Sequence, residues 1–188
     1  SKPALNCVPA ALSFGVSLKC TRPSSTSPDA NPISVQLEFD RFSPEMADIA
    51  RTFFDKNWID APVRPGKSPG AFAHPTVPSA HPYVLLNYTS RPHDVLTMAH
   101  ELGHGVHAWL ARPQGVYHFT TPLTLAETAS IFGETIVLER LLQRAPGPAE
   151  RLDLLAGALD GAVGAVFRQV AMNRFEHSVH TARRTEGE

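Results

Sequence analysis

Apolar residues recur at helical spacing in four stretches of the chain, and this pattern predicts a mainly helical fold. The first helix begins at residues 43–45 (SPE), where Ser suits the N-cap and Pro the first helical position, and it ends near Trp58. Three longer helices are predicted from about residue 90 to 113, from 121 to 144, and from 150 past 175. In the last helix, glycines share one face and indicate close packing against another helix (Gly157, Gly161 and Gly164), and the polar tail from residue 181 is expected to fray.

Shorter extended runs lie between the first two helices. Residues 71–74 and 83–88 (YVLLNY) predict two short strands, and the Pro/Gly-rich segment 61–70 predicts a loop before them. The Ser/Thr/Pro/Asn-rich segment 21–34 predicts a flexible linker, because it holds few apolar groups to offset its ordering entropy. We therefore expect a poorly structured tail and linker over residues 1–34 and a folded domain over residues 35–188.

The sequence HELGHGVH at residues 100–107 is the feature most typical of a catalytic site. His100 and His104 lie one turn apart on one helix face, so their imidazoles can bind the same tetrahedral metal ion. Glu101 projects about 100° around the helix, where its carboxylate can reach a metal-bound water without being a ligand. This spacing predicts a metal site on the helix.

The rest of this helix supports a metal site that faces a cleft. An apolar stripe lies nearly opposite the two histidines and predicts the face that packs on the core (Val95, Ala99, Leu102, Val106 and Trp109). Gly103 and Gly105 each cost about 1 kcal/mol in a helix interior relative to Ala. Two such residues in one turn indicate that another part of the chain approaches the helix backbone closely.

Several residues are candidates for a third ligand, since a catalytic zinc ion usually has three from the protein. His107 lies one turn further along and would have to bend back, and Leu110 occupies the place of the third histidine in the metzincin pattern. Glu127 and Glu134 lie two turns apart on one face of the next predicted helix. We favour Glu127 as ligand and Glu134 as the acceptor that orients a ligating imidazole, with an ordinary surface carboxylate as the alternative for Glu134.

Composition limits the partners that the chain is expected to have. Seventeen Lys and Arg against eighteen Asp and Glu give a net charge of -1, which favours neither nucleic acid nor an anionic membrane surface. No uncharged apolar run reaches the roughly 20 residues of a membrane span, and the apolar segment 3–18 only faintly resembles a signal peptide. Two cysteines, Cys7 and Cys20, fit a reducing compartment, so we expect a cytoplasmic protein.

The histidine segment extends to PHDVLTMAHELGHGVH (92–107), and two further motifs accompany it, HPYVLLNY (81–88) and LAETASIFGE (125–134). Together they resemble the active-site region of the oligoendopeptidase F and thimet oligopeptidase family of zinc metallopeptidases. WIDAPVRPGKSPGAFAHP (58–75) fits the oligoendopeptidase F branch, and FRQVAMNRFEHSVH (167–180) fits the helix that follows the metal site. The resemblance extends over about residues 37–180.

This resemblance implies a zincin-like helical catalytic segment with a small β-hairpin beside the HExxH helix. It also implies one zinc ion as cofactor and short peptides as substrates of a metalloendopeptidase. By the same resemblance His100, His104 and Glu127 match the zinc ligands. Glu101 matches the general base, and Glu134 matches an acidic residue that supports the site.

The resemblance also bears on substrate binding. Residues 68–72 (SPGAF) resemble the edge segment along which the peptide lies, so Gly70, Ala71 and Phe72 are expected to bind substrate, with a plain hairpin strand as the alternative. In the family, the donors that stabilise the oxyanion come from a His/Tyr-rich segment further downstream, which we do not find before the last residue here.

Two alternatives to an active peptidase therefore remain. One is a truncated, catalytically inactive zinc-binding fragment of such a catalytic domain. The other is a helical interaction module with an incidental motif, which would bind no zinc. Tyr117 and His118, between the two ligand helices, are expected to lie in a surface loop rather than in the cleft.

Overall fold

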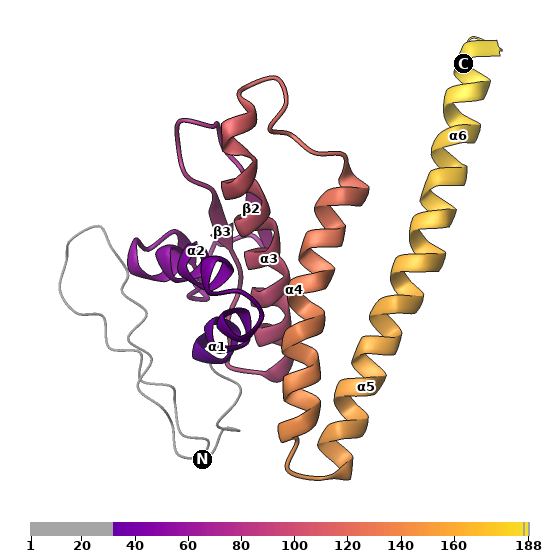
Figure 1. Ribbon diagram of the computed structural model, residues 1–188. Helices are drawn as coiled ribbons and strands as arrows, with labels where there is room; N and C mark the ends of the chain where they lie inside the picture. Colours follow the sequence, from indigo (N-terminus) through magenta and orange to yellow (C-terminus); the bar gives the residue numbers. More distant parts are fainter. Residues whose placement is uncertain (1–31, 186, 188) are drawn as a thin grey trace. The chain divides into compact units, whose positions relative to one another are not determined.

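The computed structural model describes residues 32–185 and residue 187 (Figure 1). These described residues divide into two compact units between Arg144 and Ala145. The expected tail and linker over residues 1–31 lie outside the described residues. The helices of the first unit are α1 (Pro32–Phe42), α2 (Pro44–Asp55), α3 (Pro92–Ala111) and α4 (Leu123–Arg144), with a short 3₁₀ turn at Arg112–Gln114. Its strands are β1 (Ile59–Asp60), β2 (Phe72–His74) and β3 (Tyr83–Leu85).

Three of the four predicted helices lie in this first unit (α2, α3 and α4), and the starts of α2 and α3 are held by side-chain hydrogen bonds. Ser43 caps α2, because its hydroxyl accepts a hydrogen bond from the Met46 N–H at 3.3 Å. Asp94 in the first turn of α3 accepts the backbone N–H of Arg91 at 3.1 Å and of Thr89 at 2.7 Å. The prediction of a mainly helical chain is confirmed.

Helix α1 was not predicted, and its first three residues fall in the segment expected to be linker. The reason is packing rather than propensity. Val35 and Phe39, one turn apart on α1, are completely buried, and burial of two such side chains outweighs the weak local pattern. Helix α1 therefore includes Pro32, Ile33 and Ser34, the last three residues of the segment expected to be linker.

The small sheet has the strand order β1-β3-β2 and is mixed. Strands β2 and β3 pair antiparallel, with Ala73 opposite Val84, and this is the predicted hairpin. Strand β1 pairs parallel with β3 through only two residues, a length too short for any alternating pattern to predict. Strand β2 thus forms an edge of the sheet and packs against α3, beside the HELGHGVH segment.

Helix α3 is the centre of the first unit, and α1, α2, the sheet and α4 all contact it (Figure 1). Four members of its predicted apolar stripe are buried (Val95, Ala99, Leu102 and Val106). The fifth, Trp109, is half-buried, with the Arg112 guanidinium 3.3 Å above its ring. The core therefore holds α3 on one face and leaves its histidine face for other contacts.

The second unit is one continuous helical run, which confirms the third long helix. It comprises α5 (Pro148–Val163), a π-helical segment (Gly164–Arg168) and α6 (Gln169–Thr185). The expected fraying from residue 181 is wrong up to Thr185, because α6 continues to that residue. Within this unit a Cβ at Gly157 or Gly161 would meet no atom within 4 Å, so the expected close packing of these glycines on another helix stays a prediction.

The same run is long and apolar enough, by length and composition alone, to cross a membrane. This is a weak indication by itself, because helices of soluble proteins meet the same test.

Candidate metal centre

Helices α3 and α4 cross at two glycines, which allow their backbones to touch. A Cβ at Gly103 would lie 2.5 Å from the Ala129 carbonyl oxygen, and one at Gly133 would lie 2.7 Å from the Ala99 oxygen. The close approach predicted at Gly103 is therefore found. The later residue of α3, Gly103, meets the earlier residue of α4, Ala129, and Ala99 meets Gly133, so the two helices are antiparallel. The HExxH face of α3 therefore lies against the face of α4 that carries Glu127 and Glu134.

Gly105 meets a different neighbour. A Cβ there would lie 2.8 Å from Cζ of Phe53, a buried residue of α2. The absence of a side chain at Gly105 lets α2 pack under the same turn of α3 that α4 approaches at Gly103. Both glycines of the HELGHGVH segment are thus explained by contacts, as predicted.

Three of the predicted residues lie together at this crossing. Oε2 of Glu127 is 3.4 Å from Nε2 of His100 and 3.5 Å from Nε2 of His104. The ligand atoms of these three residues all lie within 4.8 Å of one another. Two imidazole nitrogens and one carboxylate oxygen are the donor set of many catalytic zinc sites, so the group could hold such an ion.

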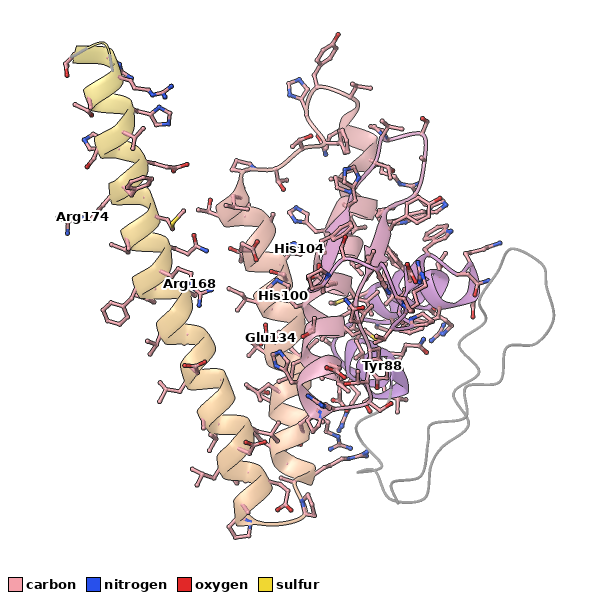
Figure 2. The ribbon with its side chains drawn as sticks, turned by 180° about the vertical axis from the view of Figure 1, so that it is seen from behind. Tyr88, His100, His104, Glu134, Arg168 and Arg174 are labelled. Atoms are coloured by element: carbon pink, nitrogen blue, oxygen red, sulfur yellow. The ribbon has the colours of Figure 1, made fainter. Side chains whose placement is uncertain are left out.

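The predicted acidic neighbour, Glu134, lies beside His100 (Figure 2). Oε2 of Glu134 is 3.1 Å from Nδ1 of His100, where it accepts the ring N–H and leaves Nε2 directed at Glu127. His104 makes a hydrogen bond with the backbone of Ala126. Each imidazole therefore has a partner on α4 that fixes its ring, as ligating histidines usually require.

The two histidines differ in their affinity for protons. The hydrogen bond to Glu134 raises the pKa of His100, and this effect outweighs the burial of the ring. Burial lowers the pKa of His104, although the Glu127 carboxylate acts in the opposite direction. A neutral His104 is ready to bind a metal ion, because its nitrogen lone pair is free of a proton.

Glu101 is buried between α3 and the sheet, with 7% of its surface exposed. The backbone N–H of Ala73, in the edge strand β2, donates a hydrogen bond to its carboxylate. Burial nevertheless raises the pKa of Glu101, and the nearby Glu127 carboxylate adds to the shift, while His100 opposes it. A carboxylate with a raised pKa is a better acceptor of protons, as a general base requires.

A cavity of about 290 Å³ opens beside Glu101. One wall is the segment before β2, the floor is α3, and the other wall is α4; the lining residues are Ala71, His93, Thr97, His100, Glu101 and Glu134. Of the three residues expected to bind substrate, Ala71 thus lines the cavity. Phe72 is 48% exposed, and neither it nor Gly70 belongs to the lining.

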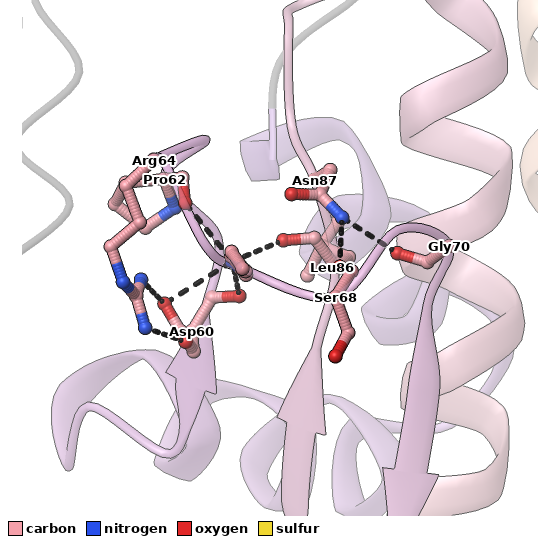
Figure 3. A network of polar contacts seen from close by, with 8 residues as sticks. Asp60, Pro62, Arg64, Ser68, Gly70, Leu86 and Asn87 are labelled. Atoms are coloured by element: carbon pink, nitrogen blue, oxygen red, sulfur yellow. Dashed lines mark hydrogen bonds and ion pairs between the residues drawn. The ribbon is translucent and has the colours of Figure 1, made fainter.

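A polar network fixes the loop that leads to β2 (Figure 3). The Asn87 side-chain amide donates to the carbonyl oxygens of Ser68 and Gly70, at 2.9 and 3.0 Å. Gly70 has φ +84°, a left-handed conformation that favours glycine. The segment expected to bind substrate is therefore a loop whose backbone is fixed by hydrogen bonds from Asn87.

Lys67 anchors the start of the same loop. Its ammonium donates to three carbonyl oxygens, those of Asp60, Pro62 and Leu86, at 2.7 to 3.0 Å. Its side chain is 2% exposed and also lies 3.2 Å from the Asp60 carboxylate, which Arg64 binds through both oxygens. A buried cation thus joins the loop to β1 and to Leu86, the residue that follows β3.

The other candidates from the sequence are not in the group. His107 is half-buried one turn beyond His104 and is absent from the metal-ligating cluster, while Tyr117 is 91% exposed and His118 is exposed, as expected of a surface loop. Sequence reasoning missed Ser130, whose buried hydroxyl contacts Glu127. Its position three residues after Glu127 on a helix was the one available signal.

Comparison with known proteins agrees with this geometry. The family model for peptidase family M3 matches residues 14–188. The chain belongs to peptidase family M3. The match begins upstream of the described helices, inside the segment that the sequence pattern assigned to the tail.

Among curated relatives of this M3 chain is oligopeptidase PepF of Bacillus subtilis, 33% identical over 145 residues, which are 77% of this chain and 21% of the relative. The chromosomal oligoendopeptidase F of Lactococcus lactis is 34% identical over 140 residues, covering 74% of this chain and 23% of the relative. Group B oligopeptidase PepB of Streptococcus agalactiae is 34% identical over 130 residues, covering 69% and 22%. The chain thus spans little more than a fifth of the length of these relatives.

Solved structures show the same fold. A crystal structure from Chlamydophila abortus, of a protein named only provisionally as a peptidase, has a TM-score of 0.68 and 29% identity, covering 84% of this chain and 27% of that one. PZ peptidase A, solved with an inhibitor, has a TM-score of 0.54 and 18% identity, covering 61% and 21%. The second likeness concerns the fold alone.

Proposed function

We propose that this M3 chain carries the metal centre of a zinc metalloendopeptidase that hydrolyses short peptides. The observation that supports this most is the group of His100, His104 and Glu127, with the buried Glu101 carboxylate next to it. The oligopeptidase names of the relatives support the substrate class.

In this proposal His100, His104 and Glu127 are the zinc ligands, and Glu134 holds the His100 ring through Nδ1. When bound, the ion would lower the pKa of a water molecule toward about 7 and polarise the scissile carbonyl. The fixed imidazole rings reduce the rearrangement that binding requires, because both Nε2 atoms already point to one carboxylate oxygen.

Glu101 serves as the general base. Its carboxylate removes a proton from the attacking water while the water oxygen bonds to the carbonyl carbon. The carbon–nitrogen bond then breaks, and Glu101 delivers the proton to the leaving nitrogen, giving an amine and a carboxylic acid, which keeps the second proton of the water until it ionises in solution. The hydrogen bond from Ala73 holds the carboxylate beside the edge strand throughout.

The substrate backbone is proposed to add to the free edge of β2. The Val84 N–H donates a hydrogen bond to the Trp58 carbonyl oxygen, on the side of β3 away from β2. Ala73 and Val84 are therefore a non-hydrogen-bonded pair, and the backbone N–H and C=O of Ala73 face away from β3. The same alternation places those of Ala71 on the free edge, beside the cavity. An extended peptide paired there would lie across Glu101, with Gly70 and Phe72 flanking its contact.

Cleavage of a quenched fluorescent peptide by the full chain, with zinc content measured on the same sample, tests this function. We expect turnover that a chelator abolishes and zinc restores. Glu101→Gln should keep its zinc and lose turnover by a factor of about 10² to 10⁴. Zinc without turnover in the parent chain would favour the zinc-binding fragment, and no zinc at all would contradict the proposal.

A further inference from the structure

Ser130 is a completely buried polar residue at the crossing of α3 and α4. A Cβ at Gly103 would lie only 2.8 Å from the Cα of Ser130, so the HExxH helix packs directly against Ser130. A buried hydroxyl is costly unless it is hydrogen-bonded, which raises the question of what this one binds.

The hydroxyl oxygen of Ser130 is 2.9 Å from Oε2 of Glu127 and 3.0 Å from the Glu127 carbonyl oxygen. A carboxylate and a carbonyl only accept, so Ser130 is the donor, and its single proton is shared between these two oxygens of Glu127. Oε2 is also the atom that faces Nε2 of His100 and of His104. The hydroxyl therefore contacts the one carboxylate oxygen on which the metal-ligating group converges.

This contact matters because, apart from the two histidines, it is the contact that holds the Glu127 carboxylate. The Glu127 side chain is 41% exposed, and a glutamate loses substantial rotamer entropy when it is held in one conformation. A bond from a fixed, buried hydroxyl restricts the carboxylate before an ion binds. The histidines receive the same support from Glu134 and Ala126, so each member of the group has a partner on α4.

We propose that Ser130 is a positioning residue for the metal centre, which holds the Glu127 carboxylate in its ligating orientation. This inference rests on the proposed function, because it assumes that the three residues bind zinc. It predicts that loss of the hydroxyl weakens zinc binding while leaving the fold and the other ligands in place.

The test is a zinc titration of the metal-free full chain and of Ser130→Ala, which removes only the hydroxyl and leaves the backbone that packs under Gly103 unchanged. We expect the dissociation constant for zinc to rise about 10- to 100-fold, the usual effect of losing a partner of a metal ligand. Thr128→Ala and Thr135→Ala are matched controls. Each removes a hydroxyl of α4 that bonds the carbonyl four residues earlier, at 2.7 Å, without touching Glu127.

A double-mutant cycle separates positioning from a merely structural role. In a Glu127→Ala background, Ser130→Ala should cause no further loss of zinc affinity, because its partner is gone. Equal losses in both backgrounds, or a zinc affinity of Ser130→Ala equal to that of the parent chain, would overturn the inference while leaving the proposed function intact. A parent chain that binds no zinc would instead overturn the proposed function.

Discussion

Glu134 shows how one residue can influence the metal centre without being a ligand. It accepts the Nδ1 proton of His100, so Nε2 carries the lone pair toward Glu127. Glu134→Gln weakens this bond, and we expect zinc affinity to fall about 10- to 100-fold. Isothermal titration measures it, with Glu139→Gln, an exposed change on the same helix, as the control. Equal zinc affinities of the two variants would show that Glu134 does not support the metal centre.

Asp60 provides a pH-dependent test of the loop network. The hydrogen bond from Arg64, with support from Lys67, lowers the pKa of Asp60 below its ordinary value of 3.8. A lowered pKa means that the folded state favours the ionised form. The contribution of the Asp60 carboxylate to stability is therefore fully present above the ordinary pKa of 3.8, and it is lost as the pH falls through the lowered pKa of the folded state.

We expect Asp60→Asn to be less stable than the parent chain at pH 7, by less than about 1 kcal/mol because the carboxylate is partly exposed to solvent. The difference should start to shrink as the pH falls below 3.8 and should vanish below the lowered pKa of Asp60. Urea unfolding at several pH values measures it. A difference that persists unchanged in acid would show that the charge on Asp60 is not its cause.

At the scale of elements, the contact between α3 and α4 determines whether the site exists. Gly103→Ala would place a Cβ 2.5 Å from a carbonyl oxygen of α4, so the helices must separate. We expect a loss of about 1–3 kcal/mol in the free energy of unfolding, together with weaker zinc binding, since the ligands lie on both helices.

Gly157→Ala is the matched control for this substitution. A Cβ there meets no atom within 4 Å, and alanine favours a helix more than glycine by up to about 1 kcal/mol. We expect unchanged zinc affinity and equal or higher helix content by circular dichroism. If Gly103→Ala behaves like this control, the crossing tolerates separation and does not position the ligands.

The sequence was most informative where one element carries the whole signal. Spacing within α3 predicted the paired histidines, Glu101 and the glycines at the crossing, because a helix fixes these relations locally. The same reasoning led to Glu127 and Glu134 as candidates, and the structure brings both to the histidines. Their assignment as ligand and support remains a proposal.

What the sequence could not predict depends on contacts between distant segments. Helix α1 has a weak pattern and is held by burial of Val35 and Phe39. Strand β1 has only two residues and is defined by its pairing with β3. The bond from Ser130 to Glu127 and the bond from Ala73 to Glu101 require the tertiary arrangement to be seen, since neither residue type signals chemistry by itself.

For the whole molecule, the metal centre links elements that are far apart in the sequence. The ligands lie on α3 and α4, and Glu101 connects the same helix to β2. A bound ion should therefore stabilise the first unit as well as carry chemistry. At zinc concentrations 100 times the dissociation constant, we expect a gain of about 2.7 kcal/mol in the free energy of unfolding.

Thermal unfolding with and without zinc checks this gain, and His104→Ala should abolish the zinc-dependent part of it. Magnesium serves as the control ion, because it prefers oxygen ligands in octahedral geometry. An equal rise with both ions, or a rise that survives His104→Ala, would locate the stabilising ion elsewhere.

The stoichiometry of zinc tests the central claim most directly. The full chain is stripped of metal, titrated with zinc, and compared with His100→Ala, His104→Ala and Glu127→Ala. The account predicts one zinc ion per chain, bound tightly by the parent and much more weakly by each variant. A parent chain that binds no stoichiometric zinc, or variants that bind it as tightly as the parent, would contradict the account.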